Sequence, residues 1–304
     1  MKHAICCGYL CCDIATMTDG FPKENHKQFT SALHTGAGGP AANAACLLAK
    51  WGVHTTLLSQ IGNDPLSDIV IADLTRFGVQ TDYLQPYDGP VNCAMIISNG
   101  QNGTRTVLSH NSAKHHPLKE MPIPQRADGV LVDGHQFEWS QRLLMHAATP
   151  SVLDAGSFRR ETQTLMHGVT DPIASTPFFI AMMDACHSQE ALEMMYPPML
   201  IVTDGENPVK EITRDATREH PVFQVTAVDT LAAGDCFHGA YLFGRLHGCN
   251  TAECILLAAG AAALSVTSRG GCHSFPTLKE TSELIKKQDS PTAENLIRRL
   301  SSLL

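Results

Sequence analysis

Short apolar runs alternate with stretches of helical periodicity along most of the chain. The runs that have the length and composition of buried strands are Ile5–Leu10, Gly129–Val132, Ser151–Leu153 and Leu200–Thr203. Because strands that alternate with helices are typical of parallel sheets covered on both faces, we predict an α/β fold with a doubly wound, mostly parallel sheet flanked by helices. The tail from Glu280 is polar and helical, and we expect one domain over residues 1–304.

Two other regions alternate between apolar and polar positions, which is typical of exposed sheet. Val91–Ser98 and Thr104–Ser109 surround a turn rich in Asn and Gly, so they predict a hairpin. The more polar segment Phe21–Leu33 predicts a further exposed ribbon.

Polar residues follow several of the predicted strands. They are Asp13 beyond the first strand, Asp133-Gly134-His135, Asp154-Ala155-Gly156 and Thr203-Asp204-Gly205. Ligands of doubly wound folds lie outside the carboxyl ends of the strands, so these residues are candidates for a site. Each of them taken alone is also explained as a turn, since Asp and Gly are common turn residues.

The stretch 225–240 carries the most specific chemistry. A β-branched run ends at Asp229, small residues follow at Ala232, Ala233 and Gly234, and a helical pattern begins near Cys236. Such a loop brings bare backbone N–H groups to a helix N-terminus, where the dipole favours an anion. Asp235 stands at that place, either as a general base or as an ordinary N-cap.

A glycine-rich segment, residues 36–43, opens a second predicted helix. Gly36, Gly38 and Ala41 match the dinucleotide pattern Gly-x-Gly-x-x-Ala, but no buried strand precedes them and no acid ends the next strand. Asn43 lies early in the predicted helix, where it could also bond within its own first turn. No Walker phosphate loop occurs in the sequence.

The motif Asp229-Thr-Leu-Ala-Ala-Gly-Asp235 resembles the Asp-Thr-x-(Gly/Ala)-Ala-Gly-Asp signature of the ribokinase-like (PfkB) sugar kinases. Gly38-Gly39-x-x-x-Asn43 resembles the first signature of that family, and the ketohexokinase-like and sulfofructose-kinase-like branches are similar as well. The resemblance implies an ATP-dependent sugar kinase that phosphorylates a hydroxymethyl group. It also implies a small β-sheet lid, here over about residues 14–35 and 90–110.

Roles of individual residues follow from the resemblance by position. Asp235 would be the catalytic base, and Ala232, Ala233 and Gly234 would form the anion hole. The residues expected to bind the sugar are Asp13, Gly38, Gly39, Asn43, Arg105, Asp133 and His135. Those expected at the ATP phosphates are Thr203, Gly205 and Gly234. Mg²⁺ would accompany ATP, and a monovalent cation such as K⁺ would be held by Asp229, Leu231, Ser265, Ser268, Gly270 and Ser274.

The chain departs from the family pattern at three places. Pro40 stands where ribokinases carry Lys, which weakens the case for ribose as substrate. No acid occurs in Ser175–Phe179, where an Asn-x-x-Glu motif organises Mg²⁺, so we expect ATP phosphates and water to hold the metal. Pro208 replaces a glycine of the nucleotide loop.

Composition adds limits on location and partners. The net charge of −8 argues against a nucleic-acid or anionic-membrane surface. The eleven cysteines contain no Cys-x-x-Cys pair, and adjacent cysteines in a strand point to opposite faces, so we predict reduced thiols and a cytoplasmic protein. We expect a homodimer formed through the lid.

The acceptor is expected to be a neutral ketose or a related sugar. His135 stands where the ketohexokinase-like and sulfosugar branches place Arg, and an imidazole lacks the bidentate fork that suits a sulfonate or phosphate. A nucleoside kinase of the same superfamily and a catalytically silent sugar-binding member are the alternatives.

Overall fold

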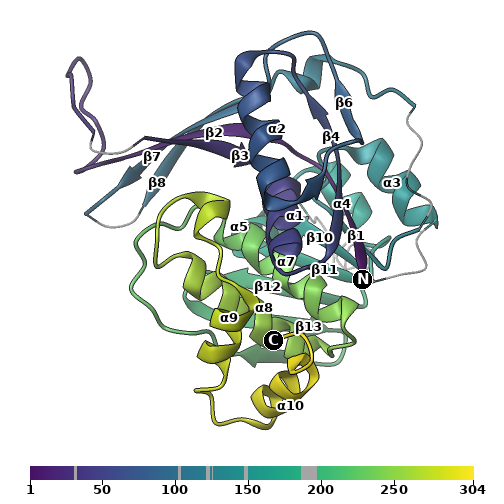
Figure 1. Ribbon diagram of the computed structural model, residues 1–304. Helices are drawn as coiled ribbons and strands as arrows, with labels where there is room; N and C mark the ends of the chain where they lie inside the picture. Colours follow the sequence, from purple (N-terminus) through teal and green to yellow (C-terminus); the bar gives the residue numbers. More distant parts are fainter. Residues whose placement is uncertain (31–32, 102–103, 121–123, 125, 147–149, 186–196) are drawn as a thin grey trace.

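A large sheet forms the middle layer of the molecule (Figure 1). The computed structural model describes residues 1–304 except 31–32, 102–103, 121–123, 125, 147–149 and 186–196. The strand order is β14 (Thr217–His220), β13 (Asn207–Thr213), β12 (Met199–Asp204), β11 (Asp171–Ser175), β10 (Ser151–Ala155), β9 (Gly129–Val132), β1 (His3–Cys7), β4 (His54–Ile61) and β5 (Val79–Gln80), with β6 (Leu84–Pro86) also paired to β4. All neighbours pair in parallel except β13 and β14, which continue the sheet as antiparallel strands.

Alternation along β1 shows how the sheet divides two apolar cores. Ala4 and Cys6 belong to the larger core, whereas Ile5 and Cys7 belong to the smaller core on the opposite face. The adjacent cysteines therefore point in opposite directions, as predicted, and every cysteine among the described residues is a free thiol.

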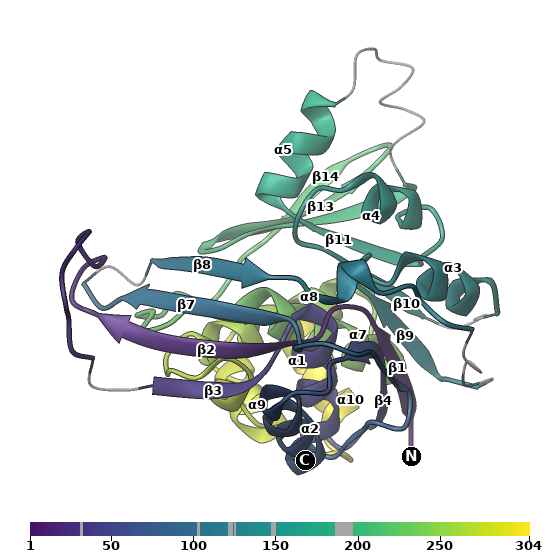
Figure 2. The ribbon, with the colours of Figure 1, turned by 90° about the horizontal axis from the view of Figure 1, so that it is seen from above.

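Helices cover both faces of the sheet (Figure 2). The larger core is covered by α1 (Pro40–Lys50), α2 (Pro65–Phe77), α7 (Ala233–Leu246), α8 (Thr251–Ser265), α9 (Leu278–Ile285) and α10 (Pro291–Leu300). The smaller core is covered by α3 (Phe137–His146), α4 (Arg160–Leu165) and α5 (Thr176–Asp184). The predicted doubly wound α/β fold is confirmed. Within the described residues, no helix is both long enough and apolar enough to cross a bilayer.

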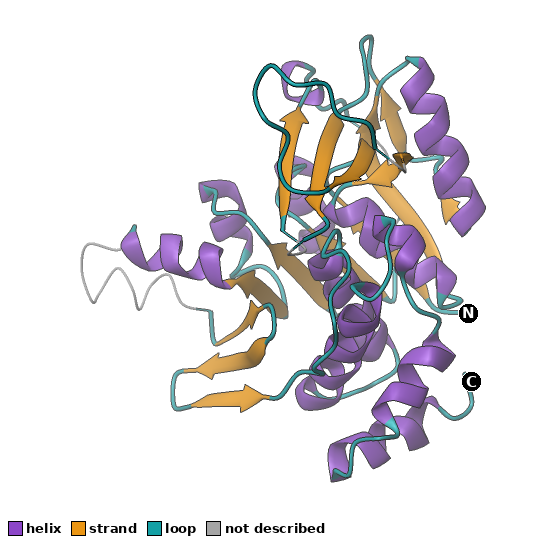
Figure 3. Ribbon diagram, turned by 90° about the vertical axis from the view of Figure 1, so that its left-hand side faces the viewer, coloured by secondary structure: helices purple, strands orange, loops and turns teal. Residues whose placement is uncertain are grey.

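A separate small sheet projects to the left of the main body in Figure 1 and faces the viewer in Figure 3. Its order is β3 (Leu33–Gly38), β2 (Cys11–Thr18), β7 (Cys93–Asn99) and β8 (Arg105–His110). The predicted hairpin of β7 and β8 is present, with antiparallel pairing. Short 3₁₀ turns, η1 (Ala113–His115) and η2 (Gly271–Ser274), complete the described elements.

Two expectations about the N-terminal region are corrected. The first strand ends at Cys7, and Asp13 lies inside the lid strand β2 rather than beyond a central strand. The ribbon predicted over Phe21–Leu33 is not formed there: residues 19–30 contain no strand, and the lid strands lie before and after them, with β2 ending at Thr18 and β3 beginning at Leu33. Gly20 has a positive φ of 82°, which lets the chain turn out of β2 where the sequence becomes polar.

The two helices that carry the kinase-like motifs, α1 and α7, pack closely against each other. A Cβ at Gly239 of α7 would lie 3.1 Å from the carbonyl oxygen of Ala44 in α1 and 3.2 Å from a methyl group of Leu47. The absence of a side chain at Gly239 therefore sets how near α7 comes to α1.

We predict that Gly239→Val lowers the free energy of unfolding by about 1–3 kcal/mol, the usual cost of overpacking a filled core. Gly168→Val is the matched control, because a Cβ there meets its neighbours at ordinary contact distances of 3.5 and 3.7 Å on an exposed turn. Its effect should stay within about 0.5 kcal/mol, as for most surface substitutions. Urea denaturation measures both values, and equal effects would contradict this account of the helix crossing.

Candidate active site

Asp235 lies in the first turn of α7. The helix begins at Ala233, and its N-cap is Ala232, whose φ of 61° and ψ of 14° are left-handed. No side chain caps this helix, so the reading of Asp235 as an N-cap is wrong. Within the described chain, the N–H groups of Gly234 and Asp235 donate to no other group, which leaves them available to an anion.

A hydrogen bond joins Asp235 to the second motif. Asn43 Nδ2 in α1 donates to Asp235 Oδ2 over 2.6 Å, across 192 residues of sequence. Asn43 is buried, and its Oδ1 has no hydrogen-bond partner among the described residues. Asn43 thus does not cap its own helix turn; it orients the carboxylate and presents a free acceptor beside it.

The electrostatic surroundings make Asp235 a weaker acid than usual. Burial and the nearby Asp154 carboxylate raise the pKa of Asp235 to about 7, although the hydrogen bond from Asn43 and the charge of His238 oppose the rise. A carboxylate with this pKa can accept a proton near neutral pH and remain largely ionised above it.

Sequence analysis missed a buried ion pair behind Asp235. His238 lies one turn further along α7, and its Nδ1 is 3.0 Å from Asp154 Oδ2 at the end of β10. Burial alone would lower the pKa of His238, but Asp154 outweighs burial and raises it. Asp154 was a site candidate because it follows a predicted strand. His238 could have been found from its spacing, because a residue three positions after Asp235 lies on the same face of the helix.

Asp13 and the glycine-rich loop come together at the base of the lid. Asp13 pairs with Gly36 across β2 and β3 and is buried, which raises the pKa of its carboxyl to about 6. A Cβ at Gly38 would lie only 2.1 Å from the Asp13 carboxyl carbon, so only glycine fits there. Gly39 is the N-cap of α1 and has a φ of 101°.

Asp133 holds this region together through the main chain. Its carboxylate accepts hydrogen bonds from the N–H groups of Tyr9 at 2.7 Å, Ala41 at 3.2 Å and His135 at 3.0 Å. Burial would raise the pKa of Asp133, but the contacts with His135 and these N–H groups keep it below its usual value. Because both oxygens are engaged, we assign Asp133 to fixing the N-terminus of α1, and its direct contact with sugar stays a prediction.

Arg105 reaches from the lid strand β8 to the loop before α7, where phosphate binding is predicted. Its Nη1 donates to the carbonyl oxygen of Thr230 at 2.9 Å and to Thr230 Oγ1 at 2.5 Å. The side chain therefore connects the lid with the loop before α7, on the side of the nucleotide cavity.

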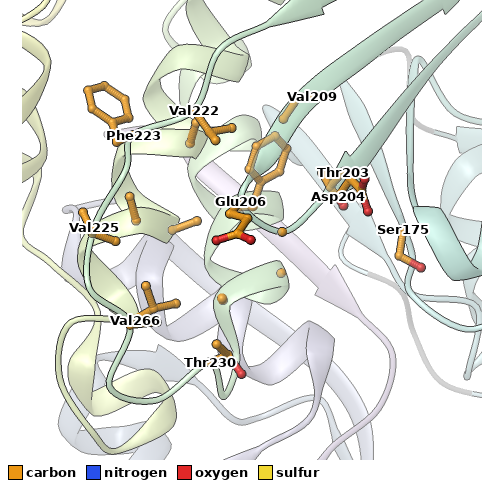
Figure 4. A pocket seen from close by; sticks show the side chains of 18 of the residues that line it. Ser175, Thr203, Asp204, Glu206, Val209, Val222, Phe223, Val225, Thr230 and Val266 are labelled. Atoms are coloured by element: carbon orange, nitrogen blue, oxygen red, sulfur yellow. The ribbon is translucent and has the colours of Figure 1, made fainter. Parts of the chain in front are cut away.

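A cavity of about 570 Å³ opens beside the N-terminus of α7 (Figure 4). The three residues predicted at the phosphates, Thr203, Gly205 and Gly234, line it together with Ala233 of the predicted anion hole. Apolar residues that the sequence did not single out also line it, among them Val222, Phe223, Val225, Ala259 and Val266. The cavity combines an apolar slot suited to a purine base with N–H groups suited to phosphate.

The segments predicted to hold a monovalent cation also lie together. The N–H groups of Val228 and Asp229 donate to the carbonyl oxygen of Val266, and a Cβ at Gly271 would touch Leu231. Ser265 and Ser274 donate their hydroxyls within their own turns. Coordination of a cation by this set, including Ser268 and Gly270, stays a prediction.

The segment Ser175–Phe179, where the family carries the motif that organises Mg²⁺, contains no acid and forms the start of α5. Ser175 Oγ accepts from the Phe178 N–H group over 3.2 Å and caps that helix. The carboxylates among the described residues that line the cavity beside α7 are those of Asp204 and Glu206. Elsewhere, Asp73, Cys272 and His273 have possible metal-ligand atoms within 4.8 Å of one another, and Asp73 already accepts a hydrogen bond from the Ala37 N–H group.

Comparison with known proteins identifies the family of the chain. Residues 1–278 match the pfkB family carbohydrate kinases. Ribokinase of Bacillus subtilis (strain 168) is 24% identical over 94% of the chain and its own full length, and deoxyribokinase of Salmonella typhi is 26% identical over 90% of the chain and 95% of its own length.

Solved structures show the same fold. A putative ribokinase from Agrobacterium tumefaciens has a TM-score of 0.87 and 26% identity, covering 94% of this chain and 98% of that one. Ribokinase of Arabidopsis thaliana, solved with ribose and ATP, has a TM-score of 0.77 and 21% identity over 93% of this chain and 98% of its own. The match over most of the sequence shows that this chain is a phosphotransferase with an alcohol acceptor and belongs to the PfkB family of carbohydrate kinases.

Proposed function

We propose that this kinase transfers the γ-phosphoryl group of ATP to a hydroxymethyl group of a small sugar. The contact between Asn43 and Asp235 carries the proposal, because it fixes a carboxylate of near-neutral pKa beside the free N–H groups of α7. The sugar would lie between Asp13, the loop of Gly38 and Gly39, and Asn43. The free Asn43 Oδ1 would accept a hydrogen bond from one of its hydroxyls.

In the mechanism, Asp235 accepts the proton of the attacking hydroxyl as the oxygen approaches phosphorus. The N–H groups at the start of α7 stabilise the negative charge that the transferred group carries. Asn43 keeps the carboxylate in position, so most of the rate enhancement comes from orientation and electrostatics. Arg105 holds the lid against Thr230 and helps to exclude water.

ATP would place its base in the apolar slot and its phosphates at Ala233 and Gly234. A structure of a putative ribokinase II from E. coli contains ATP and Mg²⁺. Mg²⁺ bound here would neutralise phosphate charge. It would be held mainly by ATP phosphates and water, because Ser175–Phe179 supplies no acid, while Asp204 and Glu206 line the cavity. We also propose a monovalent cation such as K⁺ at the loop of Asp229 and Leu231, which a titration of activity with KCl tests.

The lid is the surface that we propose joins two copies of the chain. Strand β8 is exposed along its whole length, and Met95, Val107 and Leu108 are large apolar side chains exposed on β7 and β8. A second copy of this sheet would cover them, and sedimentation velocity measures the resulting mass. The expected location is the cytoplasm, where the free thiols would stay reduced.

A nucleoside kinase and a silent sugar-binding protein remain the competing functions. The same cavity and base would serve a nucleoside, whose ribose also presents a hydroxymethyl group. ATP turnover over a panel of sugars and nucleosides separates the three functions.

We predict that Asp235→Asn lowers kcat by about 10²–10⁴-fold, the usual contribution of a general base, with a smaller effect on binding. Steady-state kinetics with the best acceptor of the panel measure kcat. Glu161→Gln, a change at an exposed acid in α4, is the control that should retain activity. Near wild-type turnover in Asp235→Asn would remove this residue from the mechanism.

The pH dependence follows from the raised pKa of Asp235. The base must be ionised, so log kcat/KM should fall by about one unit per pH unit below roughly pH 7 and level off above it. In His238→Asn the carboxylate of Asp154 loses its positive partner, and the pKa of Asp235 rises. The fall of kcat/KM on the acid side of the pH profile should therefore begin at higher pH than in the wild type. If kcat/KM of the wild type falls only near pH 4, the proposed environment of the base is contradicted.

A further inference from the structure

A guanidinium group lies at the edge of the predicted sugar site, although the sequence did not single it out. Arg159, in the loop between β10 and α4, places its Nη2 2.5 Å from His135 Nε2. His135 Nδ1 lies 3.2 Å from Asp133 Oδ1. Arg159 donates to Nε2 of the imidazole, so His135 holds the guanidinium in position on the side away from Asp133.

Ring and backbone contacts connect this pair with the sugar loop. The rings of His135 and Tyr9 are 4.6 Å apart between centroids, at an angle of 32°. A Cβ at Gly39 would lie 2.5 Å from the carbonyl oxygen of Tyr9 and 3.1 Å from its ring. Arg159, His135, Tyr9 and Gly39 are therefore successive neighbours, and the guanidinium is connected with the loop expected to bind the acceptor through His135, itself a residue expected at the sugar, and Tyr9.

The charge of Arg159 has no carboxylate partner among the described residues. The ion pairs there do not include it, and its contact with His135 uses one of its five N–H donors. Asp133 is separated from it by the imidazole and is occupied by three backbone N–H groups. The remaining donors form a planar fork that matches a phosphate, sulfonate or carboxylate.

We propose that Arg159, oriented by His135, binds an anionic group of the acceptor sugar at the end remote from the hydroxyl that is phosphorylated. This inference rests on the proposed kinase function and names the class of acceptor: a sugar phosphate, a sulfosugar or a sugar acid. It replaces the expectation of a neutral sugar, which depended on the lack of a guanidinium at position 135. The structure supplies that group from another loop.

Steady-state kinetics on matched acceptors test the proposal. The pairs are D-fructose against fructose 6-phosphate and 6-deoxy-6-sulfofructose, with D-ribose and D-gluconate as further neutral and anionic acceptors. The wild type should favour at least one anionic sugar over the neutral ones by tenfold or more in kcat/KM. Arg159→Gln should reduce that ratio by about 10- to 100-fold, the effect of losing hydrogen bonds to a charged group.

Two further variants show that the fork, and not the local fold, is responsible. Arg159→Lys keeps the charge without the planar fork and should give an intermediate ratio. Arg160→Gln removes an exposed charge from the adjacent position and should leave the ratio at the wild-type value. A neutral sugar preferred by the wild type, or an anionic preference unchanged in Arg159→Gln, would overturn the proposal.

Equilibrium binding separates failure of this proposal from failure of the kinase function. Calorimetry with the same sugars on Asp235→Asn, with and without Arg159→Gln, needs no turnover. Weaker binding of an anionic sugar by the double variant than by Asp235→Asn alone supports the anion site. This holds even if the wild type consumes no ATP with any sugar, a result that would refute the kinase proposal. Equal binding by both proteins refutes the anion site alone, and thermal unfolding curves verify that each variant is folded.

Discussion

The hydrogen bond between Asn43 and Asp235 is the interaction on which the site depends. It joins the first turns of two helices whose motifs lie almost two hundred residues apart. The bond requires α1 and α7 to be nearly in backbone contact, and Gly239 makes that approach possible. The glycine loop expected to bind the sugar is at one end of this bond, and the N–H groups proposed to bind phosphate are at the other, so in the proposed mechanism one packing contact sets the distance between the two substrates.

The left-handed conformation of Ala232 is the second constraint. A non-glycine residue in this region costs of order 1 kcal/mol, and the chain bears this cost where the loop turns into α7. The turn leaves the first N–H groups of the helix without a side-chain cap. Local strain and uncapped donors thus occur together at the point where an anion is expected to bind.

Much of the fold could be predicted because local patterns carry it. Apolar runs identified the main strands, and the loop around Ala233 and Gly234 indicated a helix N-terminus with a carboxylate. Contacts between distant segments could not be predicted in this way. Nothing near His238 shows that Asp154 faces it, and nothing near His135 shows that Arg159 reaches it. The boundary errors have a similar cause: Asp13 belongs to a lid strand because of its pairing with Gly36, not because of its neighbours in sequence.

The buried cysteines have a consequence for how the active site can be observed. Cys236 directly follows Asp235 and is fully buried, and burial raises the pKa of its thiol far above the usual value. It therefore adds no second negative charge beside Asp235, and it is a poor nucleophile while the protein is closed. Alkylation of such a thiol has to wait for α7 to separate from its neighbours. The rate at which a thiol reagent modifies Cys236 would thus report how often the first turn of α7 opens, and a ligand that bridges α7 to the lid would slow that reaction.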